Sequence, residues 1–147
     1  MKMMTVSPGM AKYFLIFTAL LAAGCAHHRP PAKPVAAQIT GTVTYLQRMA
    51  LTPDATVEVT FSDVSVQDTP GIEIGHQVIK AAGKQVPIPF VIGYDSRQIV
   101  SSHTYGVNAK IKTGEKVIFA SDAASLVLTQ GRPTNLEIIV KPVPAPK

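Results

Sequence analysis

The stretch VPIPFVIGY, residues 86–94, decides the fold, because apolar side chains occupy every second position in it. This alternation is the period of a β-strand with one buried face. Pro87 and Pro89 fall on the opposite face, and proline has no N–H to donate to a neighbouring strand. We therefore expect a strand at the edge of a sheet, or an interrupted one. The apolar positions of its buried face are Val86, Ile88, Phe90, Ile92 and Tyr94.

The same period-two pattern recurs on both sides of this stretch. Val57, Val59 and Phe61 alternate with polar residues, but Asp63 then takes the apolar position and the pattern resumes one residue late at Val64. A slip of one residue indicates a β-bulge. Three further segments have predicted apolar faces, which are Ile39, Val43 and Tyr45; Ile72, Ile74, His76 and Val78; and Tyr105, Val107, Ala109 and Ile111.

These patterns predict an all-β protein with about eight strands at short spacing. The fold class that follows is a single small antiparallel β-sandwich or a partly open barrel, spanning residues 38–141. A tight turn is expected at residues 113–116, and the one helical feature expected is a short turn at residues 95–99. We find neither an internal repeat nor a second domain.

Composition agrees with one domain that has a real core. The 147 residues are 46% hydrophobic and 16% charged, so the chain does not resemble a disordered segment. The formal charge is +5, and it falls to +3 without Lys2 and Lys12 of the first 24 residues. No basic run is present, so we expect no nucleic-acid partner.

The first 24 residues have the features of a secretory signal peptide. Lys2 and Lys12 give a positive start, and the uncharged run YFLIFTALLAA follows at residues 13–23. A run of this length is too short to span a membrane, which takes about 20 residues, but it suits a signal peptide. We expect residues 1–24 to be removed.

The end of this segment resembles a bacterial lipobox. Cys25 is the only cysteine of the chain, and small residues precede it. A thiolate is a strong nucleophile that can take a diacylglycerol unit as a thioether, and cleavage then frees an amine for a further acyl chain. Because Ala26 and not aspartate follows Cys25, the resemblance implies delivery to the periplasmic face of the outer membrane. The predicted lipidation and cleavage site comprises Leu21, Ala22, Ala23, Gly24 and Cys25.

Proline-rich segments flank the predicted domain. Residues 25–37 contain Pro30, Pro31 and Pro34 and are predicted to be an extended linker behind the lipid anchor. His27 and His28 lie in this linker without carboxylates or further cysteines nearby, so we predict no metal site there. Residues 142–147 are predicted to be a disordered tail.

No strong catalytic constellation is present, and we predict a protein that is not an enzyme and needs no cofactor beyond the covalent lipid. The best candidate for a nucleophilic site is formed by Asp95, Ser101, Ser102 and His103, which lie within nine residues. Serine, histidine and aspartate form a triad only through their geometry, and these residues are predicted to lie in an exposed loop.

Two other groups of residues could bind a ligand. His76 lies on a predicted apolar face, where a satisfied core or edge histidine is the favoured interpretation over a metal ligand. Tyr45, Tyr94 and Tyr105 alternate with core positions and are predicted to lie in the core or at its rim, with a sugar-stacking platform as the other reading.

Several segments together resemble the YbaY/YscW family of bacterial lipoproteins. They cover about residues 38–143 and include GTVTYLQRMALTPDATVEVTFSDVSV, VPIPFVIGYD, TYGVNAKI, VIFASD and NLEIIVKPV. One departure is Thr52, where the resemblance leads us to expect a second proline before Pro53. The resemblance supplies no catalytic residues.

The resemblance implies a small β-sandwich tethered to an envelope membrane. One branch of this family acts as pilotins, which bind a secretin subunit and help it reach the outer membrane. We therefore expect a non-enzymatic binding or chaperone module whose partner is a secretin or another envelope protein. The alternative that stays open is an envelope lipoprotein that binds glycan or lipid and has no secretion-system client.

Overall fold

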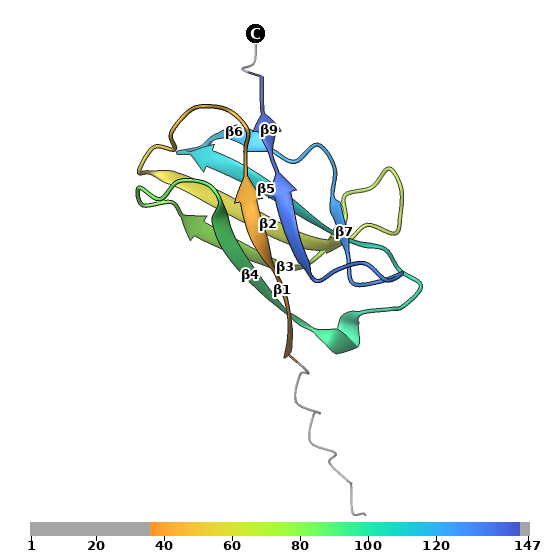
Figure 1. Cartoon of the computed structure of the whole chain (residues 1–147). Coiled ribbons are helices and arrows are strands. Elements are labelled where there is room, and N and C mark those ends of the chain that lie inside the picture. The colour runs from red at the N-terminus through yellow and green to blue at the C-terminus, as the bar shows by residue number, and fades with distance from the viewer. Residues whose placement is uncertain (1–35, 145–147) are drawn as a thin grey trace, which may run out of the picture. The chain divides into compact units, whose positions relative to one another are not determined.

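The computed structural model describes residues 36–144, which form two β-sheets around one apolar core (Figure 1). The first sheet has the strand order β4 (Ile88–Asp95), β1 (Ala36–Thr44) and β8 (Asn135–Ile139). The second sheet has the order β3 (Ile72–Lys80), β2 (Ala55–Asp63), β5 (Tyr105–Thr113), β6 (Lys116–Ala120) and β9 (Lys141–Pro142), and β7 (Ser125–Val127) also pairs with β5. Nine strands in this part of the chain confirm the predicted all-β sandwich.

Alternation places the predicted faces of four strands in the core. The apolar residues of β2 and β5 are 0–1% exposed, and Ile39 and Val43 of β1 are fully buried. Tyr45, just after β1, stacks on Phe119 with ring centroids 4.5 Å apart. The core side of β4 is formed by Ile88, Phe90 and Ile92, with Val86 and Tyr94 partly buried at its ends.

The prediction for β3 is wrong over most of its length. The pairing of β2 with β3 shifts register opposite Phe61 and Ser62, and the extra residue, Ile74, belongs to β3. β2 pairs with β5 without a shift from Ala55 to Asp63, so the bulge predicted in this strand from the slip at Asp63 is wrong. The shift reverses the face of β3 beyond Ile74. As a result, Ile79 packs on the core, while Ile72 and Val78 are 73% and 56% exposed. β2 itself ends at Asp63, so Val64 and Val66 do not continue it.

The proline positions correctly marked an edge strand. β4 forms one margin of the three-stranded sheet, and β1 is its only strand partner among residues 36–144. The Val91 N–H points away from β1 and donates to the Gln77 side chain of β3 at 2.8 Å. Pro89 lies two residues away, so its nitrogen points outward in the same way and no ladder bond is lost.

Two features of the topology were not predicted. β1 and β8 pair in parallel, whereas every other pair in the described part of the chain is antiparallel. The chain then passes from β8 of one sheet to β9 of the other through the buried Val140, whose N–H donates to the Thr44 carbonyl at 2.9 Å. This crossing joins the two sheets on one side of the sandwich.

The domain extends slightly beyond its predicted limits of 38 and 141. β1 begins at Ala36, and β9 includes Pro142, which pairs with Phe119. The Val143 N–H still donates to the Ile118 carbonyl at 3.0 Å. The first residues of the predicted tail therefore belong to the second sheet. The short turn near residues 95–99 is confirmed as a 3₁₀ turn, η1 (Ser96–Gln98).

Candidate binding site

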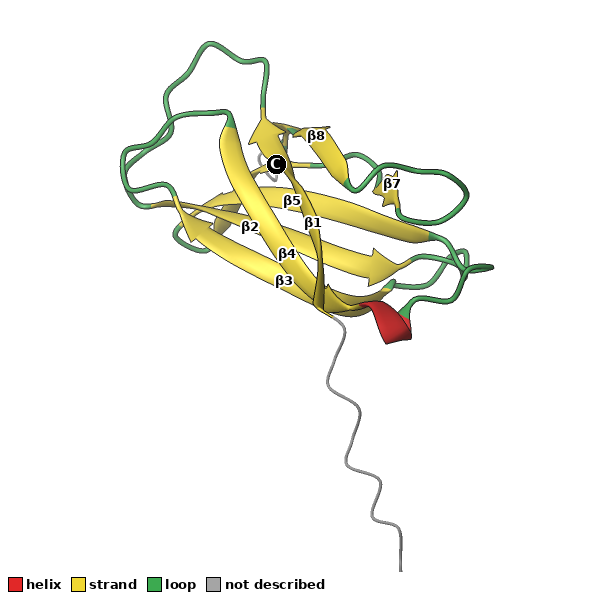
Figure 2. Cartoon of the chain, turned by 60° about the horizontal axis from the view of Figure 1, so that its bottom comes forward, coloured by secondary structure: helices red, strands yellow, loops and turns green. Residues whose placement is uncertain are grey.

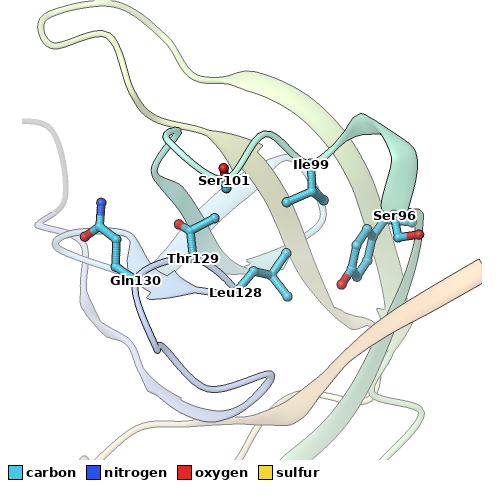
Figure 3. Close-up of a pocket in the computed structure, with 7 residues that line it drawn as sticks. Ser96, Ile99, Ser101, Leu128, Thr129 and Gln130 are labelled. Carbon is cyan, nitrogen blue, oxygen red and sulfur yellow. The ribbon is translucent and has the colours of Figure 1, made fainter.

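A cleft of about 450 Å³ lies where the end of β4 and the loop that follows it meet the loop after β7 (Figure 3). In the close-up, Ile99 and Leu128 converge from these two loops. The seven residues that line the cleft are all uncharged: Tyr94, Ser96, Ile99, Ser101, Leu128, Thr129 and Gln130.

The first wall of the cleft is fixed by local hydrogen bonds. Asp95 caps η1, because its carboxylate accepts the Arg97 N–H at 3.0 Å and the Arg97 guanidinium at 2.6 Å. The loop then returns toward β5, where the Tyr105 hydroxyl accepts the Val100 N–H at 2.9 Å. These contacts hold Ser96 and Ile99 at the cleft.

The second wall contains strained backbone. Leu128 and Gln130 have φ angles of 67° and 59°, in the left-handed region that non-glycine residues rarely occupy. Such conformations cost roughly 1–3 kcal/mol each and persist where the surroundings hold them, often at binding sites. Here the Thr129 hydroxyl donates to the His103 carbonyl at 2.8 Å and ties this loop to the first wall.

The cleft suits an uncharged group. Ile99 and Leu128 supply apolar surface, while Ser101, Thr129 and Gln130 supply hydroxyl and amide groups. The Tyr94 phenol is protonated at neutral pH and can donate a hydrogen bond, and burial raises its pKa further above neutral. An apolar side chain bordered by peptide groups matches this combination, as expected for pockets with few polar contacts.

The candidate nucleophilic site does not assemble. Asp95 holds Arg97, whereas the Nδ1 atom of His103 lies 2.6 Å from Oδ2 of Asp63. Within the described residues, no hydrogen bond joins His103 to Ser101 or Ser102. Ser101 instead lines the cleft, and Ser102 is an exposed neighbour.

Sequence reasoning missed the contact between Asp63 and His103, which are 40 residues apart. Asp63 also accepts the Ser65 hydroxyl and N–H, at 2.5 and 2.9 Å, and the Ser65 Oγ accepts the Thr104 N–H at 2.9 Å. This Asp63 network joins the end of β2 to the loop behind the cleft. The interruption of the apolar pattern at Asp63 was the signal that could have indicated a polar contact.

The Asp63 network should make stability depend on pH. Burial alone raises the pKa of Asp63, but the hydrogen bonds from Ser65 and His103 outweigh it and lower the pKa below the ordinary value. A lowered carboxyl pKa stabilises the fold at pH values above about 4, and this stabilisation is lost as the pH falls through the folded pKa.

We therefore expect Asp63→Asn to lower the free energy of unfolding by about 1–3 kcal/mol at pH 7. The difference from the wild type should begin to shrink below about pH 4, where the Asp63 carboxyl of the unfolded chain binds a proton, and it should vanish once the pH falls below the lowered pKa of the folded state. Urea unfolding of both proteins from pH 7 to pH 2.5 measures this difference. A gap that stays constant over this range would contradict the assigned role of Asp63.

Of the other residues considered for ligand binding, only Tyr94 borders the cleft. The His76 side chain is 62% exposed and lies 2.8 Å from Glu73, so its predicted place on the apolar face is wrong. Its position on the edge strand β3, with a side-chain partner, matches the edge histidine that was the favoured interpretation. Tyr45 and Tyr105 are 5% and 1% exposed, which excludes them from a sugar-stacking platform. Tyr94 packs against Phe61 with centroids 5.4 Å apart and borders the cleft.

Several predictions fall on residues that the structure does not describe. The lipidation and cleavage site at residues 21–25 and the histidines at 27 and 28 lie before Ala36. Between residues 36 and 144, no three His, Cys, Asp or Glu side chains are grouped so that they could hold a metal ion. In the same range, no helix has the length and hydropathy needed to cross a membrane.

Comparison with known proteins relates this chain to a family. Residues 34–140 match the model of the YscW family, described as the type III secretion system lipoprotein chaperone. The uncharacterized lipoprotein YbaY of Escherichia coli K12 is 31% identical over 105 residues, which are 71% of this chain and 55% of that protein. The chain thus spans about half the length of this curated relative.

A solved structure supports the same relationship. It is described as an alternative pilotin from the type II secretion system of Vibrio cholerae. The two chains are 36% identical, and their structures agree with a TM-score of 0.72. The match covers 75% of this chain and 99% of the Vibrio chain, so the likeness extends over nearly the whole of that chain.

Proposed function

The chain belongs to the YscW family of type III secretion system lipoprotein chaperones, and from this premise we propose that it is a lipid-anchored binding module that holds an envelope protein as a pilotin does. In this proposal the protein is not an enzyme. The client is a secretin or another outer-membrane protein. The observation that carries the proposal is the uncharged cleft on a sandwich that resembles a pilotin.

The first strand begins at the cleft end of the sandwich. β1 begins at Ala36, which pairs with Asp95 next to the cleft residues Tyr94 and Ser96. A lipid on Cys25 would precede Ala36 by eleven residues, which span at most about 40 Å when extended. In this proposal the anchor keeps the sandwich within about that distance of the membrane, where a membrane-associated client is met.

The lining of the cleft argues against the alternative of a glycan or lipid ligand. A sugar-binding platform requires several exposed aromatic rings, whereas Tyr45 and Tyr105 are buried and, of these three tyrosines, only the partly buried Tyr94 borders the cleft. Among the described residues, the cleft contains no cation for an anionic headgroup. We therefore propose a peptide segment as the ligand of the cleft.

Crosslinking in the native cell tests whether a protein client exists. The full-length protein is crosslinked in cells, purified under denaturing conditions and analysed by mass spectrometry. We expect a specific outer-membrane subunit to be enriched over an unrelated envelope lipoprotein. If the protein stays in the membrane fraction and no protein is enriched, the client proposal fails and glycan or lipid ligands become the subject of the search.

Two adjacent serines provide a matched test of the cleft. Ser101→Arg places a long charged side chain in the uncharged cleft, whereas Ser102→Arg adds the same charge on an exposed neighbour that does not line it. We expect Ser101→Arg to reduce the captured client at least about tenfold, because a central pocket contributes most of the binding energy. Ser102→Arg should reduce it less than about twofold. Equal effects of the two variants would place the client elsewhere.

A further inference from the structure

The sheet margins of the described part of the chain differ in how they are protected. Isolated edge strands invite pairing with another chain, and proteins guard them with proline, bulges or covering side chains. β4 carries Pro89 and is covered by Gln77, β3 contains the register shift, and β9 has two residues, one of them Pro142. β8 has neither a proline nor a bulge.

The outer edge of β8 presents unpaired backbone groups. The Thr40 N–H of β1 donates to the Thr134 carbonyl at 2.9 Å, and the Thr44 carbonyl accepts the Val140 N–H at 2.9 Å. Because backbone direction alternates along a strand, residues 134, 136, 138 and 140 point to β1 and the residues between them point away. Asn135, Glu137 and Ile139 therefore carry the outward N–H and C=O groups, and none of these groups has a backbone partner within residues 36–144.

The position of this edge connects it with the cleft. Leu128, Thr129 and Gln130 of the cleft lie in the loop that leads directly into β8. Figure 2 shows β8 at the margin of the three-stranded sheet, with β1 on one side. A segment that binds the cleft can therefore continue along the edge.

We propose that the client binds by adding an extended segment of its chain to the outer edge of β8; this inference rests on the proposed function. A row of alternating donors and acceptors is complementary to another main chain and gives affinity without sequence specificity. The side chains of the edge add specificity. Ile139 is 48% exposed and suits an apolar residue, and the Glu137 carboxylate suits a lysine or arginine directly opposite.

The same charge disfavours a second copy of this chain as the occupant. Two β8 strands that paired antiparallel about their centres would place Glu137 opposite Glu137. Like charges at directly opposite positions destabilise a strand pair. The complementary occupant is a segment with a basic residue at that position and apolar residues beside it.

Three variants at exposed sites test this surface. Glu137→Pro removes an outward N–H that no other described residue uses, so the fold should survive it, and Glu137→Lys reverses the charge while keeping the N–H. Glu115→Lys makes the same charge change in the exposed turn between β5 and β6. Circular dichroism and thermal unfolding first establish that each full-length variant is folded.

A photo-activated crosslinking residue is then placed at Asn135, and at Lys110 on the outer face of the other sheet, in full-length protein in the native cell. We expect a client adduct from position 135 and a weak one from position 110. Mass spectrometry should map the adduct to an extended segment with a basic residue. Glu137→Pro and Glu137→Lys should each reduce the adduct at least about fivefold, and Glu115→Lys should leave it unchanged.

The possible failures are distinguishable. A client adduct from position 110 alone, or one from position 135 that Glu137→Pro does not reduce, overturns strand addition and leaves the proposed function standing. Adducts between two copies of this chain identify β8 as a self-pairing edge and also overturn the inference. If neither position captures any protein while the protein remains at the membrane, the proposed function itself fails.

Discussion

Replacing Gly41 with alanine is expected to lower the free energy of unfolding by about 3 kcal/mol or more, which is a large part of the stability of a domain of this size. Gly41 lies on the core side of β1 between Phe90 of β4 and Leu136 of β8. A Cβ atom there would collide with the Leu136 carbonyl oxygen and lie 2.9 Å from the Phe90 ring. The carbonyl belongs to the parallel ladder that joins β1 to β8, so it cannot move without disturbing that ladder.

Gly93→Ala is the matched control, because Gly93 lies in the neighbouring strand and its added Cβ would meet nothing within 4 Å. Thermal and urea unfolding compare the two variants with the wild type. Gly41→Ala should melt at least about 10 °C lower, while Gly93→Ala should stay within about 3 °C. Equal melting temperatures for the two variants would mean that the β1–β8 pairing described here is incorrect.

Replacing Cys25 with serine is expected to move the protein from the membrane to the soluble fraction, with at least about a tenfold loss of membrane-bound protein. Two or more acyl chains on one residue give stable anchoring, and the variant lacks the thiol that would carry them. Labelled fatty acid should be incorporated into the wild type and not into the variant. The melting temperature of the sandwich should be unchanged, because Cys25 lies eleven residues before β1.

A substitution at Ala26 provides the control, since it changes the neighbouring position and leaves the thiol. Ala26→Ser should be labelled and remain with membranes. If Cys25→Ser still fractionates with membranes and the wild type takes up no fatty acid, the lipid anchor is wrong.

The sequence was most informative where one strand face meets the core without interruption. Val57, Val59 and Phe61 of β2 are all fully buried, as their alternation predicted. The prolines at 87 and 89 correctly marked an edge strand, because a residue without an N–H is tolerated where its nitrogen points away from the neighbouring strand, as in β4. Apolar periodicity and backbone chemistry are local properties, and the sequence shows them directly.

The errors have physical causes that act over longer distances. The bulge opposite Phe61 reversed the face of β3, so Val78 became exposed although its own pattern favoured burial. Alternation does not tell a parallel neighbour from an antiparallel one, so the pairing of β1 with β8 could not be read from either strand. The need for glycine at position 41 is a consequence of that pairing, because the Leu136 carbonyl of β8 occupies the space of a Cβ atom.

The candidate site was less predictable than the fold. The cleft joins residues 94–101 to residues 128–130, and neither segment has a motif that points to the other. The left-handed backbone of Leu128 was not foreseeable either, because leucine has no preference for that conformation. For His103, the nearby Asp95 suggested the wrong partner, since Asp63 reaches it across 40 residues of sequence.

The central claim is that this protein supports an envelope protein through the cleft. The most direct test measures the amount of the captured client in the outer membrane of cells that lack the gene. The strain is complemented with the wild type, Ser101→Arg or Ser102→Arg, each at matched expression, and the client is quantified in outer-membrane fractions. We predict that the amount of client in the outer membrane falls without the gene. The wild type and Ser102→Arg should restore this amount, but Ser101→Arg should not. A client level that is the same in all four strains would contradict the chaperone function.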